Sequence, residues 1–515
     1  MSKSSTRNRG LELLALVFGL SLLPGTAGAT IIGATGTSFN FTAKGDAIST
    51  SDGDSLWMWG YALCSNNSCG TSKSGNNNRM QYPGPTLIVN QGATVTITLR
   101  NQLPVPVSII FPGQTVTASG GTAGLLTREA QPADASAPGP QKQVTYTFTA
   151  SQPGTYTYYS GTRPDLQVEM GLVGTLIVRP AGFSATTPCP ADATVSTGCR
   201  KAYNDPSTAF DREYLFLFSD ADPLIHQQVA FASSTGTLAQ IQDAIAAIDM
   251  SARRPTDWFE NGRNFPDTLT YPNPPPNGLQ SGYPTTLPVA EQFPTQPYNE
   301  FPQMYPGEKV LIRMVGAGLD LHPFHTHGQN HVVIARDGRL LSTHPDVPAP
   351  VPDMGVSDYT TTTVPGETVD AVWGPWTGAK LGWDVYGHTD PTHSGLTGAA
   401  CTAPLAPNED INDHCKPIPV TLPSDSVLTF GIGTTGFYSG SPFLGTPGAL
   451  PPLNPDGTVH VQDNPLAGLS FMWHSHNERE LTTNDIFPGG MATMALVVPP
   501  PSICPTGNPD DCNIW

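Results

Sequence analysis

The sequence predicts an all-β protein built from many short strands. Its 515 residues include 52 glycines and 53 prolines, and only 13% of them are charged. Glycine and proline interrupt helices and mark turns. Between these turns lie short runs in which apolar and polar residues alternate, a pattern typical of strands in an antiparallel sandwich or barrel. The length is sufficient for two to four domains.

The first β domain is predicted over residues 30–180. From Ala93 to Leu99 apolar and polar residues alternate without a break, as on a strand with one buried face. The same kind of pattern predicts further strands, at residues 85–89, 144–148, 154–159 and 174–178. Proline and glycine separate these short strands, which implies an antiparallel sandwich or barrel.

The second β domain is predicted over residues 209–500, after a linker at 181–208. Strands are expected at residues 212–218, 310–315 and 494–498, and one helix is expected over Leu238–Ile248. Residues 375–470 are polar and rich in glycine and proline, and are interpreted as an insertion in this domain. Residues 501–515 form the C-terminal tail.

The N-terminus is predicted to be an export signal, residues 1–29. Basic residues precede the apolar run Leu11–Leu23, and Ala27-Gly28-Ala29 resembles a cleavage site. We therefore expect a protein that is secreted, periplasmic or at the cell surface. No later apolar run is long enough for a membrane span. The formal net charge of -18, with only 24 basic residues, argues against nucleic acid or an anionic membrane as a partner.

The eight cysteines are expected to form disulfides. They fall into four local couples, namely Cys64 with Cys69, Cys189 with Cys199, Cys401 with Cys415 and Cys504 with Cys512. An even number of cysteines in an exported chain is typical of a disulfide framework. Sequence does not fix the pairing, and cysteine ligation of a metal is the alternative.

Two short stretches hold five of the twelve histidines and form the candidate metal site. They are Leu321-His322-Pro323-Phe324-His325-Thr326-His327-Gly328 and Trp473-His474-Ser475-His476. Side chains alternate along a strand, so His325 and His327 share one face, as do His474 and His476. His322 and Ser475 point the other way. Two such pairs on neighbouring strands predict a four-imidazole site suited to Cu(II) or Zn(II). The alternative is that these are ordinary hydrogen-bonded histidines.

Both stretches resemble the histidine motifs of multicopper oxidases, with Gly489-Gly490-Met491 downstream. Tyr82-Pro83-Gly84-Pro85-Thr86, Asn101-Gln102-Leu103 and Gly171–Val178 resemble the family's first domain. The resemblance implies two cupredoxin-like Greek-key β-barrels or sandwiches, copper as the cofactor and, for a two-domain form, a homotrimer. It also implies that all four paired histidines face inward.

The chain departs from the family pattern in its first domain. Where the family has histidine pairs, this sequence has Ile110-Phe111-Pro112-Gly113 and Tyr158-Tyr159-Ser160-Gly161, and no histidine precedes His226. The first domain therefore offers no imidazole to a copper cluster. Tyr158 or Tyr159 is expected either to fill the vacated space or to act as a redox-active residue beside the metal.

The mononuclear copper site of the family is also incomplete. Ser475 replaces the cysteine, and Glu480 aligns with a ligand histidine, so only His322 and Met491 match. A blue copper centre depends on a thiolate ligand, so laccase-type oxidation is not expected.

Further residues beside the motifs have open roles. Glu478, Arg479 and Glu480 are interpreted either as partners that orient the histidines or as a salt-bridged cluster, and His331 is a further candidate ligand. His388 and His393 in the insertion offer a separate weak metal site.

Two functions follow from the sequence. The first is a secreted, multicopper-oxidase-like protein that binds copper or another transition metal through His325, His327, His474 and His476, with His322 nearby, and does limited oxidoreductase or metal-sequestration work. The second is a non-catalytic structural or binding protein that keeps the scaffold without functional copper. Neither the catalytic residues nor the substrate can be read from the sequence.

Overall fold

The computed structural model describes residues 31–64, 78–132, 142–270, 293–304, 307–375 and 469–497. The predicted signal, nearly all of the predicted insertion and the C-terminal tail lie outside these ranges. So do the loop histidines His388 and His393 and the cysteines Cys69, Cys401, Cys415, Cys504 and Cys512.

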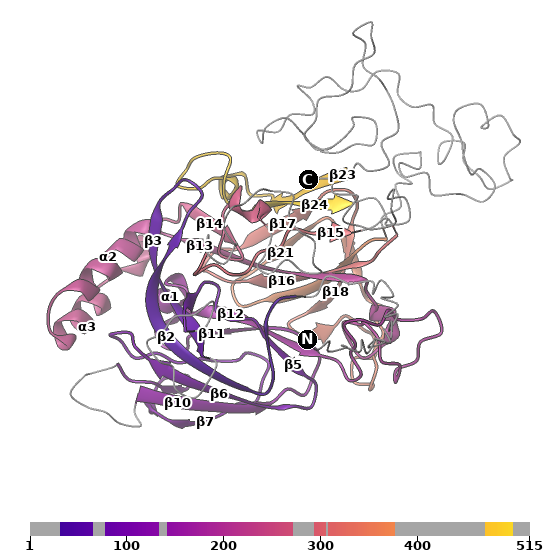
Figure 1. Ribbon diagram of the computed structural model, residues 1–515, viewed down its shortest axis with the longest axis horizontal. Coiled ribbons are helices and arrows are strands. Elements are labelled where there is room, and N and C mark those ends of the chain that lie inside the picture. Colours follow the sequence, from indigo (N-terminus) through magenta and orange to yellow (C-terminus); the bar gives the residue numbers. More distant parts are fainter. Residues whose placement is uncertain are drawn as a thin grey trace, which may run out of the picture.

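Residues 34–179 form two sheets that pack into a first sandwich (Figure 1). One sheet has the order β1-β5-β12-β11 and the other the order β4-β3-β2-β6-β10-β7. A small hairpin, β8-β9, lies beside them. The strands are β1 (Ala34–Thr35), β2 (Ser38–Ser49), β3 (Ser55–Cys64), β4 (Met80–Gln81), β5 (Leu87–Asn90), β6 (Thr94–Asn101), β7 (Thr117–Gly120), β8 (Thr122–Ala123), β9 (Arg128–Glu129), β10 (Gln143–Thr149), β11 (Gly154–Tyr159) and β12 (Val173–Arg179).

Residues 212–497 form a second sandwich, again of two sheets. The first, which we call the central sheet, has the order β14-β13-β16-β22-β18-β19, with β20 paired to β18. The second, which we call the histidine sheet, has the order β15-β24-β23-β17-β21. The strands are β13 (Arg212–Ala221), β14 (Asp257–Glu260), β15 (Gln303–Met304), β16 (Val310–Gly316), β17 (His322–Thr326), β18 (His331–Arg336), β19 (Arg339–Leu340), β20 (Val356–Asp358), β21 (Thr360–Thr363), β22 (Thr368–Trp373), β23 (Leu469–Ser475) and β24 (Ala492–Val497).

The helices within the described residues are short and flank the sheets. They are α1 (Pro164–Glu169), α2 (Pro223–Ser234), α3 (Leu238–Ala246) and the 3-10 turns Pro206–Thr208, Met250–Ala252, Asp267–Leu269 and Glu478–Leu481. The predicted helix from Leu238 is present as α3, where Thr237 and Gln240 form a capping box. The sequence analysis missed α2, although Asp222 caps it and Pro223 begins it. Figure 1 shows α2 and α3 together at one side of the molecule.

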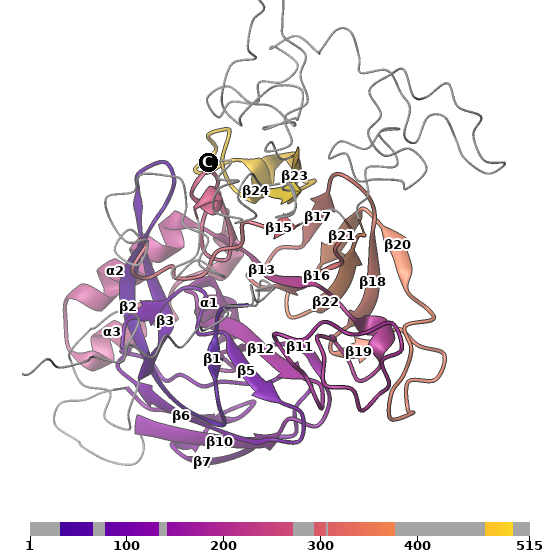
Figure 2. The same ribbon diagram turned by 45° about the vertical axis from the view of Figure 1, so that its right-hand side comes forward.

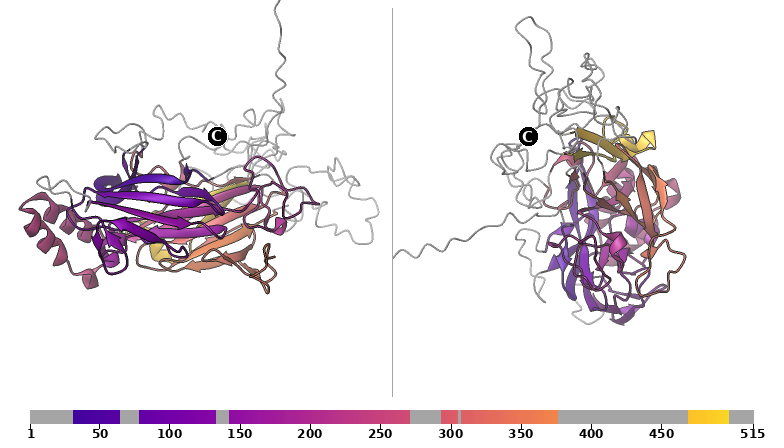
Figure 3. Two further views of the ribbon diagram at one scale, coloured as in Figure 1. Left: turned by 90° about the horizontal axis from the view of Figure 1, so that it is seen from below. Right: turned by 90° about the vertical axis from the view of Figure 1, so that its right-hand side faces the viewer.

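The sheets stack in four layers, because β12 and β13 are buried on both faces. In β12, Leu176 packs into the first sandwich, while Ile177 packs against Leu217 of the central sheet. On the far side of the central sheet, Phe216 meets Phe324 and Trp473 of the histidine sheet. The turned views in Figures 2 and 3 show the two sandwiches lying against each other. The histidine sheet is therefore an outermost layer.

The all-β class predicted from the sequence is confirmed, but the prediction of antiparallel pairing is wrong in part. β2 pairs with β6 in parallel, β5 with β12, and β13 with β16. Each of these pairs joins strands that are separated by other elements, so a crossover connects them and parallel pairing becomes accessible. Continuous apolar burial of β12 and β13 fits the two-sided burial that parallel strands usually have.

Buried ionic groups join the two sandwiches. Arg179 of β12 donates to Glu213 of β13 at 2.6 Å, and Glu213 also pairs with Arg313 of β16 at 3.1 Å. Arg313 reaches Asp370 of β22 at 3.3 Å, and Asp370 accepts a hydrogen bond of 2.6 Å from Thr155 of β11. The chain of contacts thus crosses from one sandwich to the other and back.

Two further sequence predictions, the disulfides and the lack of a membrane span, can be compared with the structure. Cys189 and Cys199 form a disulfide, as expected, and Cys64 is disulfide-bonded as well. In the part of the chain that the structure describes, no helix has the length and apolar character needed to cross a membrane.

Candidate metal centre

The two predicted histidine stretches lie on adjacent strands of the histidine sheet. β17 pairs with β23 antiparallel, and in this register His325 lies directly opposite His474. His327 follows the end of β17 and donates its backbone N–H to the carbonyl of Met472. His476 follows the end of β23 and donates its backbone N–H to the carbonyl of Pro323. The pairing therefore brings two distant parts of the chain to one place.

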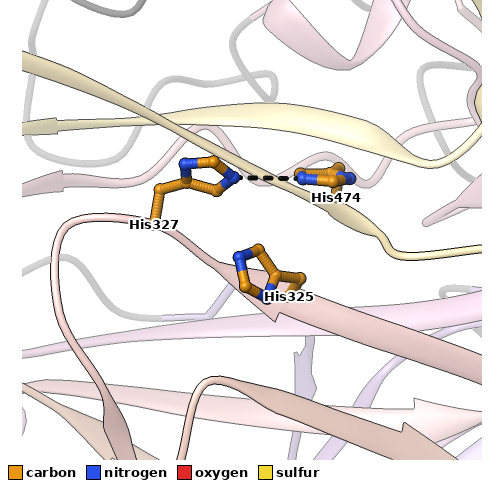
Figure 4. A group of neighbouring side chains, drawn as sticks. All are labelled: His325, His327 and His474. Atoms are coloured by element: carbon orange, nitrogen blue, oxygen red, sulfur yellow. Dashed lines mark hydrogen bonds between the residues drawn. The ribbon is translucent and has the colours of Figure 1, made fainter.

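Three of the predicted ligands form a compact cluster, shown in Figure 4. One ligand nitrogen from each of His325, His327 and His474 lies within 4.8 Å of the other two. The ring centroid of His476 is 4.9 Å from that of His325 and 5.6 Å from that of His474. We call His325, His327, His474 and His476 the histidine cluster.

Hydrogen bonds to the Nδ1 atoms fix two of these rings. His474 Nδ1 donates to the carbonyl oxygen of Ser475 at 2.6 Å, which places the lone pair of a neutral ring on Nε2. His325 Nδ1 lies 2.6 Å from the hydroxyl of Thr360 on β21. Anchoring one ring nitrogen while the other is directed at a common point is how proteins orient metal-binding imidazoles.

The spacing between two rings fits shared coordination. His327 Nε2 lies 3.2 Å from His474 Nε2. Two nitrogens that are each about 2.0–2.1 Å from one ion are about 2.9–3.4 Å apart at square to tetrahedral angles. The two rings thus already stand at the separation that a shared metal ion requires.

Burial keeps three of these histidines uncharged near neutral pH. Burial, together with the neighbouring histidines, lowers the pKa of His325 and of His327 to about 4. Burial also lowers the pKa of His474. Metal ions bind the neutral imidazole, so protons compete little at neutral pH.

The histidine cluster does not face inward as the resemblance implied. Along β17 the side chains of Phe324 and Thr326 are buried toward the central sheet, whereas His325 is only half-buried and His476 is exposed. The prediction that side chains alternate between the two faces of β17 was correct, but it is the apolar face of this strand that packs against the core. The cluster therefore lies on the outer face of the histidine sheet.

His322, the fifth predicted ligand, lies apart from the cluster. Its side chain points to the opposite face of the sheet and is fully buried. Its Nδ1 is 3.2 Å from Glu480 Oε2, and its Nε2 is 3.3 Å from Asp220 Oδ1. Carboxylate oxygens thus lie close to both ring nitrogens, although neither nitrogen makes a hydrogen bond of regular geometry among the described residues.

His331 and Tyr158 also lie away from the cluster centre. His331 is buried, and its ring nitrogens lie 2.8 Å and 2.7 Å from the hydroxyls of Thr326 and Thr361. Tyr158 is buried in the first sandwich, where its hydroxyl donates to Pro85 and its ring packs against Tyr61. Tyr159, for which the space-filling interpretation was made, is partly buried against hydrophobic residues of both sandwiches.

The acidic run after the second pair divides into different roles. Glu478 is exposed. Arg479 lies over the ring of Trp258 at 5.3 Å. Glu480 is buried and bonds to Ser475 and Asn477. Glu480 therefore lies in the interior, whereas Glu478 and Arg479 lie at the surface.

Sequence reasoning missed two residues beside the cluster, Thr360 and Tyr359. Thr360 bonds His325, and the ring centroid of Tyr359 is 5.5 Å from that of His325. Both lie about 35 residues from His325 along the chain: Thr360 begins the strand β21 that pairs with β17, and Tyr359 directly precedes it. The run of threonines at 360–363 marks a strand, but its pairing partner cannot be read from it.

The fold and site define an all-β protein with an outward-facing cluster of nitrogen donors. The family model described as Multicopper oxidase matches residues 65–182. Copper resistance protein A of Escherichia coli is 24% identical over 266 residues, which is 50% of this chain and 38% of that protein. Multicopper oxidase MCE of Talaromyces pinophilus is 33% identical over 103 residues, 19% of this chain and 15% of that protein. The chain thus matches well under half the length of these relatives.

Among solved structures, the blue copper oxidase of Nitrosomonas europaea is similar with a TM-score of 0.45 and 15% identity, covering 90% of this chain and 86% of that one. Residues 65–182 thus match the multicopper oxidase family model, and the resemblance to that family expected from the sequence is confirmed.

Proposed function

We propose that this protein binds a copper ion through His325, His327 and His474, with His476 as a fourth donor. The observation that carries the proposal is the convergence of three ligand nitrogens within 4.8 Å of one another. A set of imidazoles without carboxylates suits Cu(II) or Zn(II) better than Mg²⁺ or Ca²⁺. The relatives' names, copper resistance protein and multicopper oxidase, favour copper.

The proposed role is copper sequestration or limited redox chemistry. A copper ion held there would supply one-electron redox chemistry. The chain's own residues orient the rings through Thr360 and the Ser475 carbonyl, and keep them neutral by burial. Because the cluster opens outward, metal reaches it without passing through the core.

The proposal places this protein outside the cytoplasm, as residues 1–29 indicate. It also includes assembly into trimers, which the resemblance implies. Tyr359 beside the cluster and Val356 and Val332 on the neighbouring strands are exposed, and they offer apolar surface to a second copy. Sedimentation equilibrium on the mature protein tests the trimer against a monomer.

Metal analysis of purified, copper-loaded protein tests the binding. We expect about one copper per chain, lost in His325→Ala and retained in the matched control His344→Ala, since His344 lies in an exposed loop. Equal copper in wild type and His325→Ala overturns the proposal. Loading with zinc in competition identifies the preferred metal.

The second candidate function is a metal-free binding or structural protein. One observation favours it: His327 and His474 can hydrogen-bond each other directly at 3.2 Å, so the cluster satisfies part of its polar groups unaided. Copper-loaded protein that returns no metal after dialysis, yet remains folded and assembled, supports this function.

A further inference from the structure

We propose that Glu480 is a positioning residue that holds the two histidine-bearing strands in place for metal binding. The inference rests on the proposed function for its purpose, but the contacts of Glu480 stand independently of it. Glu480 does not touch the histidine cluster, so it acts through the strands.

On one side Glu480 holds the end of β23. Ser475 lies between His474 and His476, and its hydroxyl donates to Glu480 Oε2 at 2.5 Å. Asn477, which follows His476, donates from its side chain to Glu480 Oε1 at 3.0 Å. The backbone on both sides of His476 is thereby tied to one carboxylate.

On the other side Glu480 holds the beginning of β17. His322 is the first residue of that strand, and its Nδ1 lies within ion-pair distance of Glu480 Oε2, at 3.2 Å, without hydrogen-bond geometry. Asp220 of β13 meets the opposite ring nitrogen at 3.3 Å. All three side chains are at most 1% exposed, so water does not compete for these contacts.

The carboxylate therefore bridges the strands that carry the two histidine pairs. The described β17–β23 pairing covers only Phe324–Thr326 against Trp473–Ser475. A register slip of one residue turns every side chain of a strand to the other face. A buried bridge at the end of so short a pairing keeps His325 opposite His474.

A second metal site at these residues does not fit the geometry. Glu480 and Asp220 contact opposite nitrogens of the His322 ring, so one ion cannot bind the ring and both carboxylates together. Asp220 also pairs with Arg253, and Arg253 pairs with Glu169 of α1 at 2.6 Å. The carboxylates thus belong to an ion-pair network that continues into the first sandwich.

The test compares Glu480→Gln with Glu478→Gln, a matched control that makes the same substitution at an exposed position two residues after His476. Copper affinity is measured by competition with a chelator, and the Cu(II) site by electron paramagnetic resonance. Loss of a residue that orients metal ligands typically weakens binding by about 10–100-fold. We expect that loss and an altered spectrum in Glu480→Gln, and neither in Glu478→Gln.

A crystal structure of each copper-free variant separates this proposal from the proposed function. We expect the separation of 3.2 Å between His327 Nε2 and His474 Nε2 to change in Glu480→Gln and to persist in Glu478→Gln. If the wild type binds no copper, the comparison of these copper-free structures alone tests the positioning role of Glu480. An unchanged separation with unchanged copper affinity overturns the positioning role. If Glu480→Gln does not fold, Ser475→Ala, which removes the bond on the β23 side only, is judged by the same outcomes.

Discussion

His327 Nε2 and His474 Nε2 face each other at 3.2 Å across two strands that are 147 residues apart in the chain. Because His474 Nδ1 donates to a backbone carbonyl, His474 Nε2 accepts and His327 Nε2 donates. A metal ion would take the place of the shared proton. The pair is therefore a metal-free resting arrangement of the proposed site, and its behaviour with pH and with metal can be measured.

We expect the metal-free protein to lose stability as the pH falls from about 6.5 toward 4. Folding lowers the pKa of His325 and His327 to about 4, whereas unfolded histidine has a pKa of about 6.5. Between these values the unfolded chain binds more protons than the folded one, so stability rises with pH. Urea unfolding at about pH 5 and about pH 7 measures this difference. In the variant His325→Gln/His327→Gln the difference should shrink, whereas His344→Gln should leave it unchanged.

Copper-loaded protein should show no intense blue charge-transfer band in its visible spectrum. That band requires a thiolate–copper bond, and Ser475 stands at the position concerned with its hydroxyl bonded to Glu480. His322, the nearest imidazole on that face, already has carboxylates at both nitrogens. An intense blue band from the wild-type protein would contradict this account of Ser475.

The sequence predicted the parts of the site that depend on local alternation. The two residues of each His-x-His pair share a face because a strand repeats every two residues, and Ser475 points away for the same reason. The resemblance placed Glu480, Ser475 and His322 at one site, but local alternation alone does not predict their contact, because it depends on which strands lie side by side. For the same reason, the contact of Thr360 with His325 and the parallel pairing of β13 with β16 could not be predicted from the sequence.

Which face of a strand is buried also could not be read from the histidines alone. Phe324 and Trp473 take the core side, since burying large aromatic rings stabilises the fold more than burying imidazoles does. The histidines then fall on the outer face. In the first sandwich, the alternation from Ala93 to Leu99 predicted the buried face of β6 correctly, because there every second residue is apolar.

Breaking the ionic network between the sandwiches should strongly destabilise the protein. In Arg313→Met, Glu213 and Asp370 lose a buried cation that lies 3.1 Å and 3.3 Å from their oxygens. Glu213 keeps its pair with Arg179, but Asp370 is left buried without the cation that faced it. Removing one partner of a buried pair costs about 3–5 kcal/mol, because the remaining charge stays uncompensated. Chemical denaturation measures the cost. Arg336→Met, which breaks an exposed pair with Glu367, should cost under about 1 kcal/mol. Similar losses in both variants would contradict the role of the network.

Replacing Glu260 by glutamine should stabilise the protein at neutral pH. In the β13–β14 register Glu260 lies opposite Phe218, and neither carboxyl oxygen has a hydrogen-bond partner among the residues that the structure describes. Burial raises the pKa of Glu260 well above its ordinary value, and nearby Glu300 raises it further. The folded protein therefore binds a proton that the unfolded chain releases above about pH 4.3, so this contribution to stability is lost as the pH rises.

Glutamine keeps the shape of the protonated carboxyl without that pH dependence. The expected gain is about 1.4 kcal/mol for each pH unit between the unfolded pKa and the measurement, up to the folded pKa. Thermal unfolding of Glu260→Gln at about pH 4 and about pH 7 should show the gain only at the higher pH. Glu478→Gln, an exposed change of the same kind, should show none. Equal or lower stability of Glu260→Gln at about pH 7 would mean that the carboxylate is ionised and solvated in the folded protein.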